Sequence, residues 1–102
     1  MAVKPYVLAE QAYLTDLRRH FHAHPEVSLK EYETCKKIEA ELDSMGIPHK
    51  RIGETGVYGW IDGKKAGDGV TVALRADIDA LAMDDLKEVP YHSQNQGVCH
   101  AC

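Results

Sequence analysis

Apolar side chains recur at helical spacing in the first part of the chain. Over residues 6–21 they stand three, four or seven positions apart, which puts them on one face of a helix. These positions are Val7, Leu14, Leu17 and Phe21. Pro25 cannot donate a backbone hydrogen bond and restricts the residue before it, so the predicted helix ends ahead of this proline.

A second helix is predicted between Ser28 and Gly46. Ser28 and Glu31 have the spacing of a capping box, with Ser28 as the N-cap residue. Apolar residues then step by three or four positions along one face: Tyr32, Cys35, Ile38, Leu42 and Met45. Gly46 suits a left-handed C-terminal cap, and Pro48 prevents the helix from continuing.

After Gly46 the pattern becomes that of β-strands. Residues 47–52 and 57–61 are short and compatible with strands, and a turn-rich run follows over residues 62–69. Residues 70–74 form a continuous apolar run, as expected for a strand buried on both faces of a sheet. Two helices followed by three strands predict an α/β fold. Residues 80–102 show no clear periodicity and are expected to form a loop.

The charge and composition of the chain exclude several classes of function. The net charge is −4, and the basic residues are scattered, so nucleic acid is not an expected partner. No run of residues is long and apolar enough for a membrane span, and the first residues do not resemble a signal peptide. The three cysteines are an odd number for a disulfide framework. A cytoplasmic protein with reduced thiols or metal-binding cysteines is therefore expected.

Two carboxylates follow the predicted buried strand. Asp77 and Asp79 are two residues apart, which places them on the same side of an extended segment. In α/β sheets, ligands bind beyond the carboxyl ends of strands. The pair could hold a cation or orient a neighbouring histidine. The alternative is that one of them caps a following turn or helix, and the spacing alone favours that alternative.

The last four residues contain three potential metal ligands, Cys99, His100 and Cys102. Thiolate and imidazole suit zinc and related divalent metals. The pattern is also compatible with half of a structural zinc site, with a redox-active cysteine pair, or with two buried thiols. The alternating histidines His20, His22 and His24 cannot converge on one helix face, so they are predicted to be exposed imidazoles at a helix end.

Three motifs in this order resemble a known family. Residues 18–28, with Glu31 and Thr34, are similar to the opening motif of bacterial and plant amidohydrolases. Residues 73–81 resemble the strand motif of that family, and residues 90–102 its approach to a metal-binding motif. The family includes hippurate hydrolase, N-acyl-amino-acid deacetylases and auxin-conjugate hydrolases, and it is related to aminoacylase.

The resemblance implies a two-metal centre, usually of zinc or manganese, at the strand ends of a mixed central sheet. Cys102 matches a metal ligand that the resemblance implies is shared by both ions. Asp79 matches an aspartate that orients a ligand, whereas Asp77 stands where related peptidases have a histidine ligand. The motif includes His100, but the resemblance assigns it no role. Cys99 replaces a usual methionine, and Asp85 stands where glutamate is common.

The resemblance also implies a reaction. Members of the family hydrolyse the amide bond of N-acyl amino acids or similar small conjugates, and some form homodimers through a further domain. Metal-activated water and Lewis-acid contact with the carbonyl suit this reaction. Residues 1–102 are expected to be the N-terminal portion of the catalytic domain, inactive alone and weak in metal affinity. The alternatives are a binding module with a structural metal at Cys99 and Cys102, or a thiol-disulfide redox protein.

Overall fold

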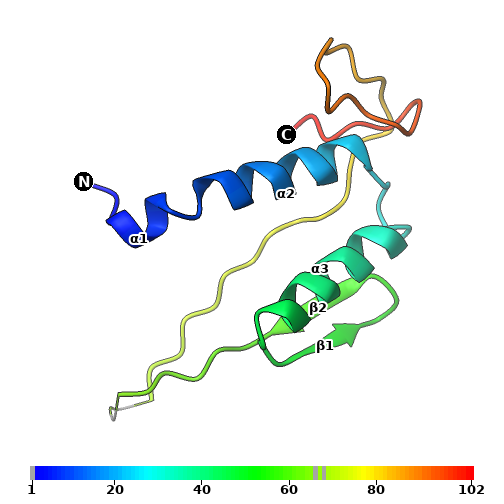
Figure 1. The fold of residues 1–102 in the computed structure, drawn as a ribbon. Coiled ribbons are helices and arrows are strands. Elements are labelled where there is room, and N and C mark those ends of the chain that lie inside the picture. The colour runs from blue at the N-terminus through cyan, green and yellow to red at the C-terminus, as the bar shows by residue number, and fades with distance from the viewer. Residues whose placement is uncertain (1, 66, 68) are drawn as a thin grey trace.

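A computed structural model describes residues 2–65, 67 and 69–102. The chain begins with helices and continues into a hairpin: α1 (Pro5–Leu8), α2 (Gln11–Ala23), α3 (Tyr32–Ser44), β1 (His49–Ile52) and β2 (Gly56–Gly59). Figure 1 shows α2 and α3 as the two main helices, with the hairpin lying beside α3. The predicted helices and the first two predicted strands are therefore present, with shifted ends.

The predicted first helix is split in two. The N–H of Glu10 donates to the carbonyl of Val7 at 3.1 Å, a tight turn that separates α1 from α2. The expected apolar face remains open to solvent at Val7 and Leu14, which are 44% and 55% exposed. The amphipathic pattern thus predicted the helical conformation, but among the described residues only the Leu17 and Phe21 end of its apolar face is half-buried.

Helix α3 starts at Tyr32, and the predicted capping box is wrong. Glu31 Oε1 accepts a hydrogen bond from the N–H of Leu29 at 2.8 Å instead of reaching Ser28. The N-terminus of α3 is capped by Glu26, which accepts from the N–H and the hydroxyl of Thr34 at 2.6 and 2.7 Å. A carboxylate satisfies free N–H groups and complements the positive end of the helix, so it displaces the weaker serine cap.

The C-terminus of α3 follows the prediction. Gly46 has a φ of +68°, which favours glycine because a side chain is disfavoured in this region. The N–H of Ile47 donates to the carbonyl of Leu42 at 2.9 Å, and the N–H of Gly46 donates to that of Asp43 at 3.0 Å. This pair of bonds is a Schellman motif. The helix therefore ends on a glycine cap, as the sequence predicts.

The hairpin packs on α3 and provides its local core. Strands β1 and β2 are antiparallel, with His49 opposite Gly59 and Ile52 opposite Gly56. Cys35, on α3, is fully buried. A side chain at Gly59 would come within 3.6 Å of Leu42 on the helix, so the sheet approaches α3 closely. A small helix-on-sheet layer results, consistent with the predicted α/β class.

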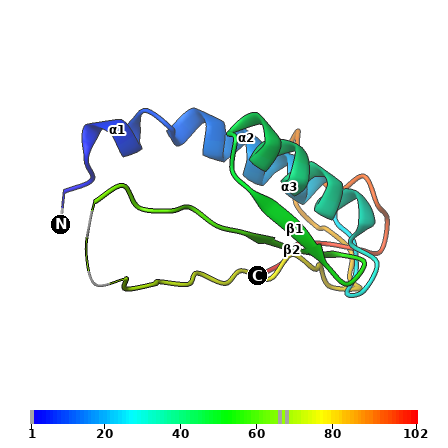
Figure 2. The same ribbon diagram turned by 90° about the horizontal axis from the view of Figure 1, so that it is seen from below.

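The prediction of a buried strand over residues 70–74 is wrong for the described chain. The segment is extended but pairs with no strand there, and Val70, Val72 and Leu74 are 87%, 80% and 97% exposed. Figures 1 and 2 show it as part of a long excursion that leaves β2 and returns toward the C-terminal end of α2. Strand assignment requires a hydrogen-bonded neighbour, and an apolar run alone does not supply one.

The tail is attached to the linker between α2 and α3. Val27 and Ala80 form a parallel bridge, and Leu81 and Cys99 form an antiparallel one. The N–H of Ala80 donates to the carbonyl of Glu26 at 2.8 Å. The predicted loop is therefore largely irregular but held at defined points. Among the residues described, no helix has the length and apolar character needed to cross a bilayer.

Candidate metal centre

A cavity of about 280 Å³ brings together residues that were predicted as candidates from the sequence. Asp77, His100 and Cys102 line it from the returning segment and the end of the tail. The remaining walls come from α2, from α3 and from the returning segment. They contain Arg18, Phe21 and His22 on α2, Thr34 and Ile38 on α3, and Ile78 on the returning segment. The Asp77 carboxylate thus lines the same space as the His100 imidazole and the Cys102 thiol, which lie 23 and 25 residues further along the sequence.

His100 is the strongest indication that this cavity binds a cation. Its Nε2 atom is buried and has no hydrogen-bond partner among the described residues. Burial, assisted by the nearby His22, lowers the pKa of His100, which keeps the imidazole neutral and its lone pair free. With the Cys102 thiol beside it, this donor set fits zinc or a similar divalent ion. Cys102 is exposed, so a metal can reach it.

The two aspartates occupy different positions around this cavity. Asp77 lines it and pairs with Arg75, whose Nη2 lies 2.8 Å from Asp77 Oδ1. Asp79 lines a neighbouring hollow together with Asp77 and Glu31. Its negative charge opposes the lowering of the His100 pKa, so Asp79 is near enough to influence that imidazole. The role of Asp79 as an orienting residue stays a prediction.

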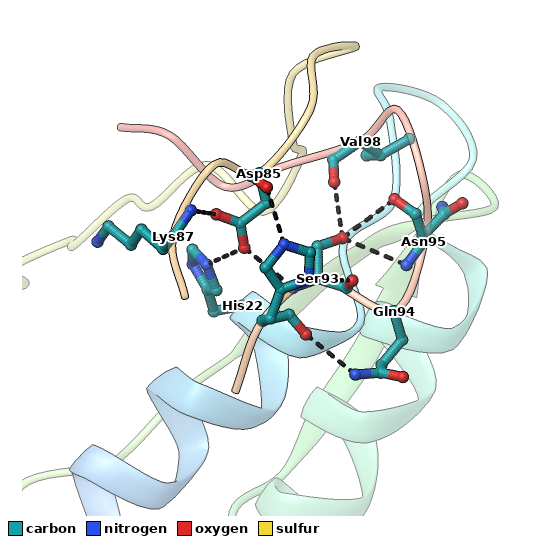
Figure 3. A network of polar contacts seen from close by, with 8 residues as sticks. His22, Asp85, Lys87, Ser93, Gln94, Asn95 and Val98 are labelled. Atoms are coloured by element: carbon teal, nitrogen blue, oxygen red, sulfur yellow. Dashed lines mark hydrogen bonds and ion pairs between the residues drawn. The ribbon is translucent and has the colours of Figure 1, made fainter. Parts of the chain in front are cut away.

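The prediction that His20, His22 and His24 are all exposed is wrong for His22. His20 and His24 are exposed, but His22 is only 4% exposed. Its Nε2 lies 2.9 Å from Oδ2 of Asp85. Figure 3 shows the two side chains pointing toward each other. The spacing of residues along the helix could not predict this contact, because Asp85 lies 63 residues further along the sequence.

Asp85 is the centre of the polar network in Figure 3. Besides His22, its carboxylate accepts from the N–H of Ser93 at 2.9 Å and from the N–H of Lys87 at 3.0 Å. Its side chain is 2% exposed. The bonds from Ser93 and Lys87 hold the pKa of Asp85 far below its usual range, so the group stays ionised.

Ser93 and the residues after it fix the tail around Asp85. The Ser93 hydroxyl lies 2.7 Å from the carbonyl of Val98 and 3.0 Å from that of Asn95, and it can donate to either. Asn95 Nδ2 donates to the carbonyl of Pro25 at 3.0 Å. The network therefore ties the tail to the linker after α2 and holds His22 at the edge of the cavity.

Two proteins of known structure are similar to this chain in both sequence and fold. A dinuclear metal-binding peptidase of the M20 family, the YXEP protein of Bacillus subtilis, is 40% identical with a TM-score of 0.84. The match covers 92% of this chain and 26% of that protein. A candidate aminohydrolase of methicillin-resistant Staphylococcus aureus is 35% identical, with a TM-score of 0.85 over 95% of this chain and 26% of the other. The resemblance to the co-catalytic metallopeptidases is confirmed.

Relatives of similar sequence are also described as hydrolases. An uncharacterized hydrolase of Staphylococcus aureus (strain bovine RF122) is 47% identical over 93 residues, or 91% of this chain. One of Staphylococcus saprophyticus is 43% identical over 95 residues, or 93% of this chain. The chain spans 24% of the length of each of these relatives. No protein-family model matches the chain. The described fold is similar to part of the fold of the M20 peptidase and of the aminohydrolase.

The sequence did not predict that His22, Asp85 and Cys99 lie together. Their donor atoms lie within 4.8 Å of one another. The sequence pattern indicated Cys99 as a potential metal ligand together with Cys102, whereas Asp85 was distinguished only by standing where the family often has glutamate. The single available signal was their chemistry, since histidine, aspartate and cysteine far apart in a sequence have no spacing that predicts contact.

Proposed function

We propose that this chain is the N-terminal portion of the catalytic domain of a metal-dependent amidohydrolase that cleaves the amide bond of N-acyl amino acids. The observation that carries the proposal is the convergence of Asp77, His100 and Cys102 on one cavity with an unsatisfied imidazole nitrogen. The similarity to a dinuclear metal-binding peptidase supports the same class of reaction.

The residues of the cavity suit both parts of such a substrate. Arg18 lies in its wall and offers a guanidinium group for the carboxylate of an amino acid. Phe21, Ile38 and Ile78 offer apolar surface for an acyl group. The charge and polarity of this site therefore match a small N-acyl amino acid.

Two divalent ions, zinc or manganese, are proposed as cofactors. Cys102 would hold metal through its thiolate, and the orientation of neighbouring ligands would fall to Asp79. A bound ion supplies an activated water and a Lewis acid for the amide carbonyl. The chain's own task is then to bind the substrate carboxylate at Arg18 and to exclude water with the apolar wall. Ligands from outside these 102 residues and a homodimer formed through another domain belong to the same proposal.

The thiol-disulfide alternative is less well supported. Cys99 is 5% exposed and lies beside Asp85, whereas Cys102 is exposed and lines the cavity. Burial raises the pKa of Cys99, so its thiol is protonated at neutral pH and a poor nucleophile. The two cysteines thus belong to different groups of side chains.

The proposal is tested by hydrolysis of N-acetyl and N-benzoyl amino acids. The longer polypeptide encoded by the same reading frame should be active with zinc or manganese, and the 102-residue chain inactive. Replacing Cys102 by serine in the longer polypeptide should reduce kcat/KM by about 100-fold or more, because a metal ligand is lost. Cys35→Ser, at a buried thiol that does not line the cavity, is the matched control. Full activity of Cys102→Ser would contradict the proposal.

A further inference from the structure

A second group of metal-ligating side chains lies next to the cavity. His22 comes from the last turn of α2, Asp85 from the tail loop and Cys99 from the bridge to Leu81. We propose that these three residues form a second metal site, distinct from the cavity of Cys102, that binds a zinc-type divalent cation and holds the tail against α2. This inference does not depend on the proposed enzymatic activity.

The donor atoms already stand near coordination distance. One nitrogen of His22, one oxygen of Asp85 and the sulfur of Cys99 all lie within 4.8 Å of one another. Tetrahedral zinc with bonds of about 2.0–2.3 Å places its ligand atoms about 3.3–3.7 Å apart. The 2.9 Å contact between His22 and Asp85 must therefore open slightly, while Cys99 moves inward. Rotamer changes are enough for shifts of this size.

The chemistry of the three donors selects the ion. One thiolate, one imidazole and one carboxylate form a mixed sulfur, nitrogen and oxygen set, which suits zinc and cobalt and disfavours magnesium and calcium. Two negative charges would balance the charge of a divalent ion. Binding replaces the proton of the Cys99 thiol and any proton on His22 Nε2, and both protons pass to solvent.

The surroundings hold the donors as a metal site requires. The N–H groups of Ser93 and Lys87 bind the Asp85 carboxylate and fix its orientation. Leu81 and Cys99 exchange two backbone hydrogen bonds of 2.9 Å, which fixes the backbone of the sulfur ligand. Tyr91 packs its ring edge-on against His22 at 5.7 Å. Such supporting contacts orient ligands and raise affinity.

The arrangement is well buried but has one open direction. His22 and Cys99 are 4% and 5% exposed, and the Asp85 side chain is 2% exposed. His22 also lines the cavity of Cys102, which gives an ion a route to the cluster. A fourth ligand, water or a further side chain, can enter from that side.

Cobalt(II) titration of the reduced 102-residue chain tests the proposal, because cobalt coordinated by a thiolate has a near-ultraviolet charge-transfer band. The experiment uses a Cys102→Ser background, so that Cys102 cannot contribute sulfur. We expect that background to bind one equivalent with the thiolate band. Adding Cys99→Met, which replaces the thiol by a larger thioether that cannot form a thiolate, should abolish the band and weaken binding roughly 100-fold. Adding Cys35→Ser instead should change neither.

Three outcomes would overturn the second site. They are loss of the band in Cys102→Ser alone, an unchanged band after Cys99→Met, or loss of the band after Cys35→Ser. Thermal unfolding without metal verifies that Cys99→Met is folded. If it is not, Cys99→Ala replaces it and should show the same loss. A negative cobalt titration would refute the second metal site without changing the expected result of the amide hydrolysis assay on Cys102→Ser. The two proposals can therefore fail independently.

Discussion

His92 lies between two backbone carbonyl groups. Its Nε2 is 2.8 Å from the carbonyl oxygen of Asp85, and its Nδ1 is 2.9 Å from that of Ser93. A carbonyl oxygen only accepts, so both bonds form only when both ring nitrogens carry protons. These two bonds raise the pKa of His92 above its ordinary value of 6.5. Protonated His92 therefore stabilises the loop around Asp85.

This arrangement predicts a pH-dependent stability. Because the folded-state pKa is raised, the contribution of His92 is fully present below pH 6.5 and is lost as the pH rises through the folded pKa. His92→Gln should lower the midpoint temperature of unfolding at pH 5.5 and have a smaller effect at pH 9, as calorimetry can measure. His24→Gln, at an exposed imidazole, serves as the control. An equal effect of His92→Gln at both pH values would contradict the prediction.

Asp85 has the opposite dependence. Its folded-state pKa is depressed, so its contribution is present above its ordinary pKa of 3.8 and is lost only as the pH falls below it. Asp85→Ala should therefore destabilise the chain by a similar amount from pH 5 to pH 8, as urea unfolding would show. Asp84→Ala, at the exposed neighbouring carboxylate, should have little effect. A wild-type chain that already loses stability between pH 6 and pH 5 through Asp85 would refute this assignment.

At the scale of elements, the N-terminus of α3 allows the observed capping residue, Glu26, to be compared with the predicted one, Ser28. Glu26→Ala removes the acceptor of the Thr34 N–H and should cost about 1–2 kcal/mol of unfolding free energy. Ser28→Ala should cost less than about 0.5 kcal/mol, because its side chain does not cap the helix. Urea denaturation of both variants measures the difference. A larger loss for Ser28→Ala would restore the capping box.

The other end of α3 provides a backbone test. Gly46 has a φ of +68°, and alanine there should destabilise by about 1 kcal/mol although no neighbouring atom lies in its way. Gly63 also has open space around its Cα, but its backbone is not left-handed. Gly63→Ala should be neutral or slightly stabilising. Chemical unfolding of Gly46→Ala and Gly63→Ala measures the change in unfolding free energy for each variant. Equal changes would contradict a contribution from backbone strain at Gly46.

Local signals in the sequence predicted helices and their ends better than contacts between distant residues. Gly46 and Pro48 marked the end of α3 because a helix cap involves only neighbouring residues. The start of α3 was missed because Glu26, which provides the cap, lies eight residues from Thr34. For the candidate site, Asp77, His100 and Cys102 were found through motifs. His22 and Asp85 were not, because only the tertiary fold brings them together.

At the scale of the whole molecule, the excursion over residues 70–74 exposes an apolar edge. Val70, Val72 and Leu74 face solvent and have open backbone groups for pairing with another strand. The 102-residue chain should therefore self-associate as its concentration rises, as light scattering after gel filtration would show. Val72→Lys should suppress this association, whereas Lys64→Gln, in the exposed turn before it, should not. A monomer at every concentration would contradict the expectation.

The hydrogen bonds from the tail to the linker after α2 also determine when the chain can fold. The carbonyls of Ala23, Pro25 and Glu26 accept from Gln94, Asn95 and Ala80 respectively. During synthesis, the linker leaves the ribosome about 70 residues before its last partner, Asn95. Helices α2 and α3 can form earlier, but their relative orientation is fixed only after that partner emerges. Until then, the nascent chain presents the exposed faces of both helices to chaperones.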